Sequence, residues 1–221
     1  MADRNSTAAA SQIKAAIFDY GMVLCYAPGA SAFAGLAGVL GVDPARFRPA
    51  YDVDRLEYDR GAFSAAEYWQ HLAARVGVGI TSEQIARLRQ LDLEIWSDIN
   101  QPMVDWVRQL RFLGVKTALL SNMPSEMMTH VRTFSWIDVF NCLTFSCELG
   151  VVKPEAGIYR HCLQNLGVPA QDAIFFDDRA TNVSGAQKVG MKALQFESIE
   201  KLTKDLRQLG MTDGLLPVVR A

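Results

Sequence analysis

Residues 13–24 read IKAAIFDYGMVL and decide the fold: a short apolar run ends at an acidic residue, Asp19. The run at 13–18 is rich in residues that favour β-strands, and its apolar residues are nearly continuous. Such a run is typical of a strand buried on both faces, as in the parallel sheets of α/β proteins. The sequence therefore predicts a parallel sheet with a buried strand that ends at Asp19.

Four further runs of the same kind follow, at 115–120, 142–146, 173–176 and 192–196. Segments with helical spacing of apolar residues separate or follow them, at 101–113, 154–166, 181–189 and 198–209. This alternation predicts an α/β fold with a Rossmann-like, doubly wound parallel sheet and right-handed crossovers. Asn100 is the expected N-cap of the helix at 101–113.

The stretch 27–98 does not follow this alternation, because it contains no convincing strand. Its clearest patterns are helical, at 65–77 and 81–99, the second capped by Thr81 or Ser82. A crossover helix needs only about a dozen residues. We therefore expect residues 27–98 to be an inserted α-helical subdomain, residues 13–26 and 99–221 the α/β core, and residues 1–12 a flexible tail.

Composition excludes several classes of protein. The chain has 221 residues, 50% of them hydrophobic, and a net charge of −2, so neither disorder nor binding to nucleic acid or an anionic membrane is indicated. No spanning helix and no signal-type segment is predicted. Four scattered cysteines without a C-x-x-C pair indicate neither disulfides nor zinc. We expect a cytoplasmic monomer or homodimer without nucleic-acid or membrane partners.

Polar side chains follow the predicted strands, where ligands bind in open parallel sheets. They are Asp19, Ser121, Asn122, Lys153, Asp177 and Asp178. Each alone has an ordinary explanation as a helix cap, a turn residue or a solvated corner. Together on successive strand ends they indicate a functional site.

The chemistry of this set is coherent. Three converging carboxylates repel one another unless a cation lies between them, and hard oxygen ligands suit Mg²⁺. A lysine with hydroxyl, amide and backbone donors suits a phosphate dianion. One carboxylate can then act as a nucleophile and form an aspartyl-phosphate.

Four segments resemble the motifs of the haloacid dehalogenase-like (HAD) superfamily of hydrolases. They are IFDYGMVL (17–24), LLSN (119–122), GVVKPEAGIY (150–159) and IFFDDRATNVSGA (174–186). The resemblance covers residues 13–197, and the insertion resembles the helical C1 cap of that family. The third and fourth motifs are most similar to the branch that contains α-D-glucose-1-phosphate phosphatase and the phosphatase domain of soluble epoxide hydrolase.

The resemblance implies a metal site and a nucleophile. Asp19 would be the nucleophile and a Mg²⁺ ligand, and Asp178 would be the second carboxylate ligand, with Asp177 beside it. The backbone carbonyl of Gly21 would complete the set, and Asn182 would orient the acidic loop.

The resemblance also implies a phosphate site. Ser121 and Asn122 would hold phosphate oxygens, and Lys153 would bridge Asp19 and the phosphate. The chain would then be a Mg²⁺-dependent phosphatase of a small phosphorylated metabolite, in particular a sugar phosphate, with an aspartyl-phosphate intermediate.

Gly21 departs from the family pattern, because phosphatases of the superfamily usually have an acid–base Asp there. Three explanations compete, in this order of preference. The first is that the substrates have good leaving groups, such as anomeric sugar phosphates, and need no proton donor. The second is that water or a residue of the insertion, Asp59 or Tyr58, supplies the proton. The third is that the chain is a weakly active or non-catalytic module that binds phosphorylated ligands.

A haloacid dehalogenase is a less favoured function, since those enzymes need no metal and lack the acidic pair of the fourth motif.

The insertion is the expected source of specificity. Its aromatic residues and arginines are Tyr51, Tyr58, Phe63, Tyr68, Trp69, Trp96, Arg46, Arg48, Arg55 and Arg60. Most of these aromatics are expected in the core of the insertion and most arginines on a solvated face. The loop 21–31 is the expected hinge.

Overall fold

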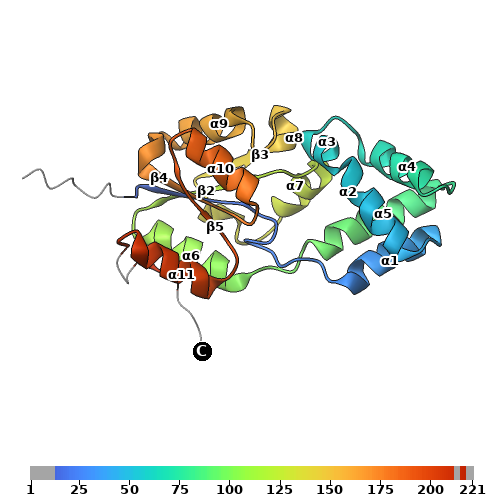
Figure 1. Cartoon of the computed structure of the whole chain (residues 1–221), viewed down its shortest axis with the longest axis horizontal. Coiled ribbons are helices and arrows are strands. Elements are labelled where there is room, and N and C mark those ends of the chain that lie inside the picture. The colour runs from blue at the N-terminus through green and yellow to red at the C-terminus, as the bar shows by residue number, and fades with distance from the viewer. Residues whose placement is uncertain (1–12, 212–214, 218–221) are drawn as a thin grey trace, which may run out of the picture.

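Five parallel strands form one sheet in the order β3-β2-β1-β4-β5 (Figure 1). The computed structural model describes residues 13–211 and 215–217. The strands are β1 (Ala15–Phe18), β2 (Lys116–Ser121), β3 (Cys142–Phe145), β4 (Ala173–Asp177) and β5 (Lys192–Gln195). The predicted doubly wound α/β fold is confirmed.

The central strand β1 pairs with β2 on one side and with β4 on the other. Phe18, its last residue, is in register with Leu119 of β2 and Phe176 of β4. All three strands run in the same direction, so Asp19, Ser121 and Asp177 meet at one edge of the sheet.

Helices cover both faces of the sheet. On one face lie α6 (Gln101–Phe112), α7 (Ser125–Val131) and α11 (Ile199–Gln208), and on the other lie α9 (Ala156–Leu166) and α10 (Ala180–Lys188) (Figure 1). The two faces alternate along β1: the Phe18 ring packs 5.4 Å from that of Trp106, whereas Ile17 belongs to the opposite core. Burial on both faces explains why β1 is apolar throughout.

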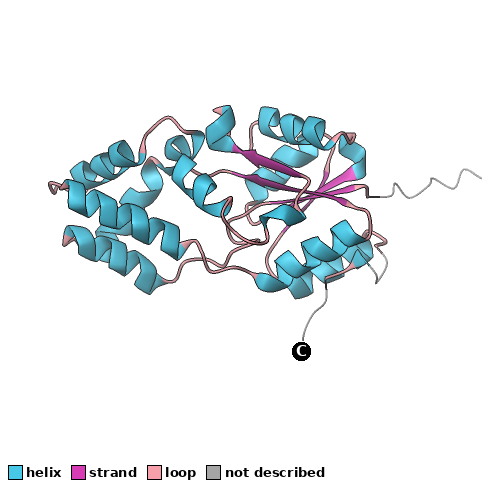
Figure 2. Cartoon of the chain, turned by 180° about the vertical axis from the view of Figure 1, so that it is seen from behind, coloured by secondary structure: helices cyan, strands magenta, loops and turns pink. Residues whose placement is uncertain are grey.

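The helices α1 (Ala30–Leu40), α2 (Pro44–Val53), α3 (Arg55–Arg60), α4 (Ala65–Arg75) and α5 (Ser82–Ile95) form what we call the helical unit. It lies beside the sheet domain and follows β1 in the chain (Figure 2). Its helices bury their own hydrophobic core, which contains Trp69. Capping boxes begin α4 at Ser64 and α5 at Thr81.

Some local features differ from the sequence prediction. Asn100 is the N-cap residue of α6, but its side-chain oxygen makes no capping bond and has no hydrogen-bond partner among the described residues, while its amide donates to the carbonyl of Val23. The helix predicted from residue 154 begins at Ala156. The short helices α7 and α8 (Ser146–Leu149) have too few turns for a periodic apolar pattern.

Polar contacts connect the helical unit to the sheet domain. The Ser146 hydroxyl donates to the backbone carbonyl of Asp59 at 2.5 Å. Arg60 donates to the carbonyl of Gly150 and forms an ion pair with Glu155.

Within residues 13–211 and 215–217, no helix combines the length and the apolar character needed to cross a membrane.

Gly185 in α10 is required by close packing. A Cβ atom there would lie 2.8 Å from Cβ of Pro154 and 2.9 Å from the Tyr159 hydroxyl, closer than van der Waals contact allows. Pro154 follows Lys153, one of the candidate site residues, so α10 packs directly beneath that part of the site.

We predict that Gly185→Ala lowers the free energy of unfolding by about 1–3 kcal/mol, because the added methyl overpacks the contact with Pro154. Gly38→Ala is the control, since nothing lies within 4 Å of a Cβ at that helical position. It is expected to raise stability by about 0.5–1 kcal/mol through helix propensity. Urea unfolding measures both, and equal stability of the two variants would contradict the packing argument.

Candidate active site

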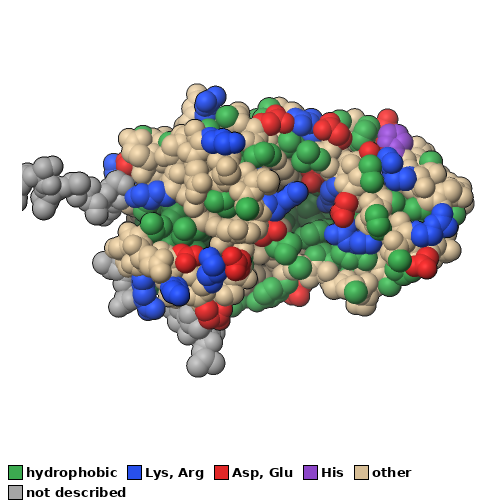
Figure 3. Space-filling view, in the orientation of Figure 1, with side chains coloured by type: hydrophobic (Ala, Val, Ile, Leu, Met, Phe, Trp, Pro, Cys, Tyr) green, Lys and Arg blue, Asp and Glu red, His purple; other side chains and the backbone are tan. Residues whose placement is uncertain are grey.

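A cavity of about 520 Å³ lies between the sheet domain and the helical unit, at the carboxyl ends of the strands. Figure 3 shows a hollow there, with hydrophobic and charged side chains around it. The predicted residues that border the cavity are Asp19, Gly21, Ser121, Asn122, Lys153, Asp178 and Asn182. Asp177 lies directly behind it and is fully buried. The structure thus brings together every residue that the sequence predicts for the metal and phosphate sites.

Lys153 lies at the centre of the charged groups. Its Nζ is 2.8 Å from Oδ1 of Asp19 and 2.6 Å from Oδ2 of Asp177, and all three side chains are nearly inaccessible to water. Burial alone lowers the pKa of Lys153, but attraction to Asp177 and Asp19 outweighs it and raises that pKa above its ordinary value. Lys153 is therefore a fixed cation, with one of its three donors left for a ligand.

The environment of Asp19 disfavours its charged form, in contrast to that of Lys153. Burial raises the pKa of Asp19 to about 7, and the charges of Asp177 and Asp178 add to the effect, although Lys153 opposes it. Ligand oxygens of Asp19, Asp177 and Asp178 all lie within 4.8 Å of one another. Three carboxylates so close to one lysine have an excess of negative charge, and a divalent cation with oxygen ligands matches this donor set.

Asp177 differs from the other two acids because both of its oxygens already accept hydrogen bonds. Oδ1 accepts from the backbone N–H of Arg179 and the amide of Asn182, and Oδ2 accepts from Lys153. Asp177 holds Lys153 in place in this geometry. The amide of Asn182 in turn fixes Asp177 and the acidic loop after β4.

Asn122 is also engaged. Its amide donates to the backbone carbonyl of Lys153 at 3.1 Å, and its carbonyl oxygen accepts from the backbone N–H of Lys153 at 2.8 Å. These two bonds clamp the loop that carries the lysine. The Ser121 hydroxyl makes only a long 3.5 Å contact, with the backbone carbonyl of Asn122, so this hydroxyl is available at the cavity.

Residues of the helical unit form the opposite wall. Asp59 borders the cavity, and burial raises its pKa to about 6 against the attraction of Arg55, 3.0 Å away. Tyr58 does not border the cavity: it is buried, and its ring stacks on Tyr68 at 4.3 Å. Of the two predicted proton donors, only Asp59 faces the site.

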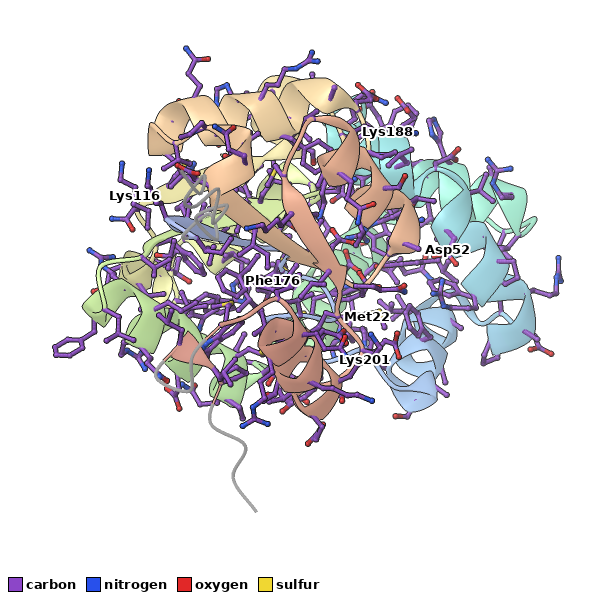
Figure 4. All side chains as sticks on the ribbon, turned by 60° about the vertical axis from the view of Figure 1, so that its left-hand side comes forward. Met22, Asp52, Lys116, Phe176, Lys188 and Lys201 are labelled. Carbon is purple, nitrogen blue, oxygen red and sulfur yellow. The ribbon has the colours of Figure 1, made fainter. Side chains whose placement is uncertain are left out.

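Several cavity residues were not predicted from the sequence as site residues. They are Tyr20, Met22, Asp52, Leu56, Met123, Met127 and Arg179. Arg179 and Tyr20 adjoin predicted site residues, so proximity to a motif was a usable signal. Met22 and Asp52 come from the sheet domain and the helical unit respectively, and Figure 4 labels both.

Comparisons with known proteins identify similar hydrolases. The family model for haloacid dehalogenase-like hydrolases matches residues 12–190. A sesquiterpene phosphatase of Aspergillus oryzae is 29% identical over 155 residues, which are 69% of this chain and 77% of that protein. Flavin mononucleotide hydrolase 1 of Arabidopsis thaliana is 46% identical over 66 residues, 30% of this chain and 27% of that protein.

Among solved structures, a HAD family enzyme of Bacteroides thetaiotaomicron in complex with magnesium and inorganic phosphate has a TM-score of 0.70. The alignment covers 84% of this chain and 94% of that one at 22% identity. At this level of identity, the likeness establishes a shared fold.

We predict that Lys153→Met lowers the free energy of unfolding by about 3–5 kcal/mol, because it leaves Asp19 and Asp177 buried without their cation. Lys201→Met is the matched control. Lys201 also lies between two acids, Glu197 and Asp205, but on the exposed surface of α11. Its loss is expected to have little effect on the free energy of unfolding, because exposed ion pairs are screened by water. Urea unfolding in EDTA compares the two variants, and a similar small loss for both would contradict the assigned role of Lys153.

Proposed function

The chain belongs to the haloacid dehalogenase-like hydrolase family, and we propose that it is a Mg²⁺-dependent phosphatase of small phosphorylated metabolites. The observation that carries this proposal is the buried lysine between two carboxylates, with a third carboxylate beside the same cavity. Two relatives named for phosphate-ester hydrolysis, the sesquiterpene phosphatase and the flavin mononucleotide hydrolase, support it.

The carboxylates of Asp19 and Asp178, with the backbone carbonyl of Gly21, would hold Mg²⁺. Asp177 is the third acid of the cluster, and direct coordination by it would exchange one of its present hydrogen bonds. When bound, Mg²⁺ neutralises the acids and the charge that develops on the transferred phosphoryl group. Lys153 and the Ser121 hydroxyl would hold phosphate oxygens, and the engaged Asn122 would contribute by fixing the lysine loop.

In this proposal Asp19 attacks the phosphorus atom. A bond forms between a carboxylate oxygen of Asp19 and phosphorus, the bond between phosphorus and the ester oxygen breaks, and the alcohol leaves with a proton. Water then attacks the phosphorus of the aspartyl-phosphate, which releases inorganic phosphate and regenerates Asp19. The helical unit would act as a cap that excludes bulk water from both steps.

The proton for the leaving oxygen has two candidate sources. Substrates whose leaving groups are stable as anions, such as the anomeric sugar phosphates that the family resemblance favours, need little help. For other esters we propose Asp59, which faces the cavity with a pKa of about 6 beside Arg55, Asp92 and Arg179. A group with this pKa is partly protonated near neutral pH, as a general acid requires.

We predict that a panel of phosphate monoesters, including glucose 1-phosphate and phenyl phosphate, contains substrates whose turnover is lost in EDTA and restored by Mg²⁺. Asp19→Asn is expected to lower kcat by about 10³-fold or more, because the nucleophile is removed. Phosphate release measures both effects.

The competing function is a non-catalytic module that binds phosphorylated ligands, and Gly21 is the feature that favours it. Thermal shifts with Mg²⁺ and the same esters, but no turnover of any of them, would establish that module and contradict the phosphatase.

Gly21→Asp tests the missing acid–base group directly. A Cβ at position 21 would lie 3.8 Å from the Trp96 ring, an ordinary contact, so this backbone position has room for a Cβ atom. We predict about a tenfold or greater rise in kcat for alkyl phosphates, whose leaving groups need a proton, and little change for phenyl phosphate. Gly21→Asn is the isosteric control, and an equal effect of Asn would contradict proton transfer as the cause.

A further inference from the structure

Apolar side chains cover much of the cavity wall away from the charged groups. They are Met22, Leu56, Trp96, Met123 and Met127. Met22 is 45% exposed and Leu56 is 43% exposed, so both present apolar surface to water at this site. Covering such surface with an apolar ligand is favourable in proportion to the area buried.

The backbone at Met22 is strained. Its φ is +59°, a left-handed conformation that no other non-glycine residue among the described ones adopts. Such a conformation is energetically unfavourable and is found preferentially at functional sites. The turn is held in place by Tyr20, whose hydroxyl donates to the Trp96 carbonyl at 2.5 Å. The strain and this bond position two of the apolar wall residues, Met22 and Trp96.

The polar groups of the same wall already bond to one another. The Tyr51 hydroxyl donates to Asp92 at 2.6 Å and accepts from the indole N–H of Trp96 at 3.2 Å. Arg55 binds Tyr51, Asp59 and Asp92. Arg48 forms an ion pair with Asp52 and lies over the Phe33 ring at 4.3 Å.

A sugar would need several partners for its hydroxyl groups in this cavity, because burying a hydroxyl without a hydrogen bond is costly. The wall supplies few groups that are not already engaged. An apolar group has no such requirement, and methionine side chains adapt to varied apolar shapes.

We propose that the substrate is the phosphate monoester of a bulky apolar or aromatic alcohol, whose hydrocarbon part lies on Met22, Leu56 and Trp96. This proposal rests on the proposed phosphatase function and specifies its substrate class. The phosphate lies at Lys153 and Ser121, and the ester oxygen lies between the two regions.

Paired aryl esters test the apolar wall without changing the leaving-group chemistry. Phenyl phosphate and 1-naphthyl phosphate have similar leaving groups, but the second has a larger apolar surface. We expect kcat/KM to be about tenfold higher for 1-naphthyl phosphate than for phenyl phosphate, and higher than for glucose 1-phosphate. Preference for glucose 1-phosphate, or equal values for the two aryl esters, would overturn the proposal.

A substitution in the wall locates the effect. Leu56→Gln is expected to lower kcat/KM for 1-naphthyl phosphate about fivefold, with the loss mainly in KM. Leu209→Gln is the matched control, because Leu209 is 48% exposed and does not border the cavity. Equal effects of the two variants would overturn the assignment of this wall.

Binding of 1-naphthylmethylphosphonate, measured by calorimetry with Mg²⁺, separates this proposal from the phosphatase itself. If no ester is hydrolysed but this phosphonate binds about tenfold more tightly than benzylphosphonate, the phosphatase is wrong and the apolar site stands. If esters are hydrolysed and the two phosphonates bind equally, the phosphatase stands and the apolar site is wrong.

Discussion

The buried ion pairs of Lys153 with Asp19 and Asp177 are the interaction on which the rest of the site depends. Two acids at adjacent strand ends cannot be buried together unless a cation separates them. The parallel register of β1 and β4 brings the acids together, and the loop before α9 supplies the lysine. Asn122 clamps the backbone of that lysine, while Asn182 fixes Asp177. Because Gly185 has no side chain, the loop that carries Lys153 and Pro154 can pack closely against α10.

This arrangement leaves a local excess of negative charge, although the whole chain has a net charge of only −2. Asp178 is the third acid of the cluster, and its pKa is raised by burial and by Asp177. A bound cation would relieve that repulsion and at the same time prepare the site for a phosphate. The proposed metal dependence and the proposed phosphatase activity therefore have one electrostatic origin. The remainder of the cavity is a different environment, in which apolar side chains are exposed.

The sequence predicted the sheet well because buried parallel strands are continuous apolar runs, and β1 shows this pattern clearly. It also identified the charged residues, since each lies at or directly after the end of a strand or within a family motif. It did not give the hydrogen-bond partners of side chains that have a choice of several. The Asn100 amide donates to the carbonyl of Val23, and Asn122 bonds to the backbone of Lys153. Composition does not encode such choices.

The apolar wall was beyond prediction for another reason. Met22, Leu56 and Met127 come from three distant segments, and only the folded chain brings them to one cavity. An exposed leucine in a short helix such as α3 has no distinguishing pattern of its own. The same limit applied to the choice between Tyr58 and Asp59, because which of two adjacent residues faces the cavity depends on the packing of Tyr58 against Tyr68.

The most direct test of the central claim is acid quenching during turnover of a phosphate monoester with Mg²⁺, followed by mass spectrometry of the peptides. Our account predicts a phosphoryl group on the carboxylate of Asp19, formed and lost at rates compatible with turnover. Steady turnover in which the phosphoryl group is found on another residue, or on none under conditions that preserve acyl phosphates, would contradict it.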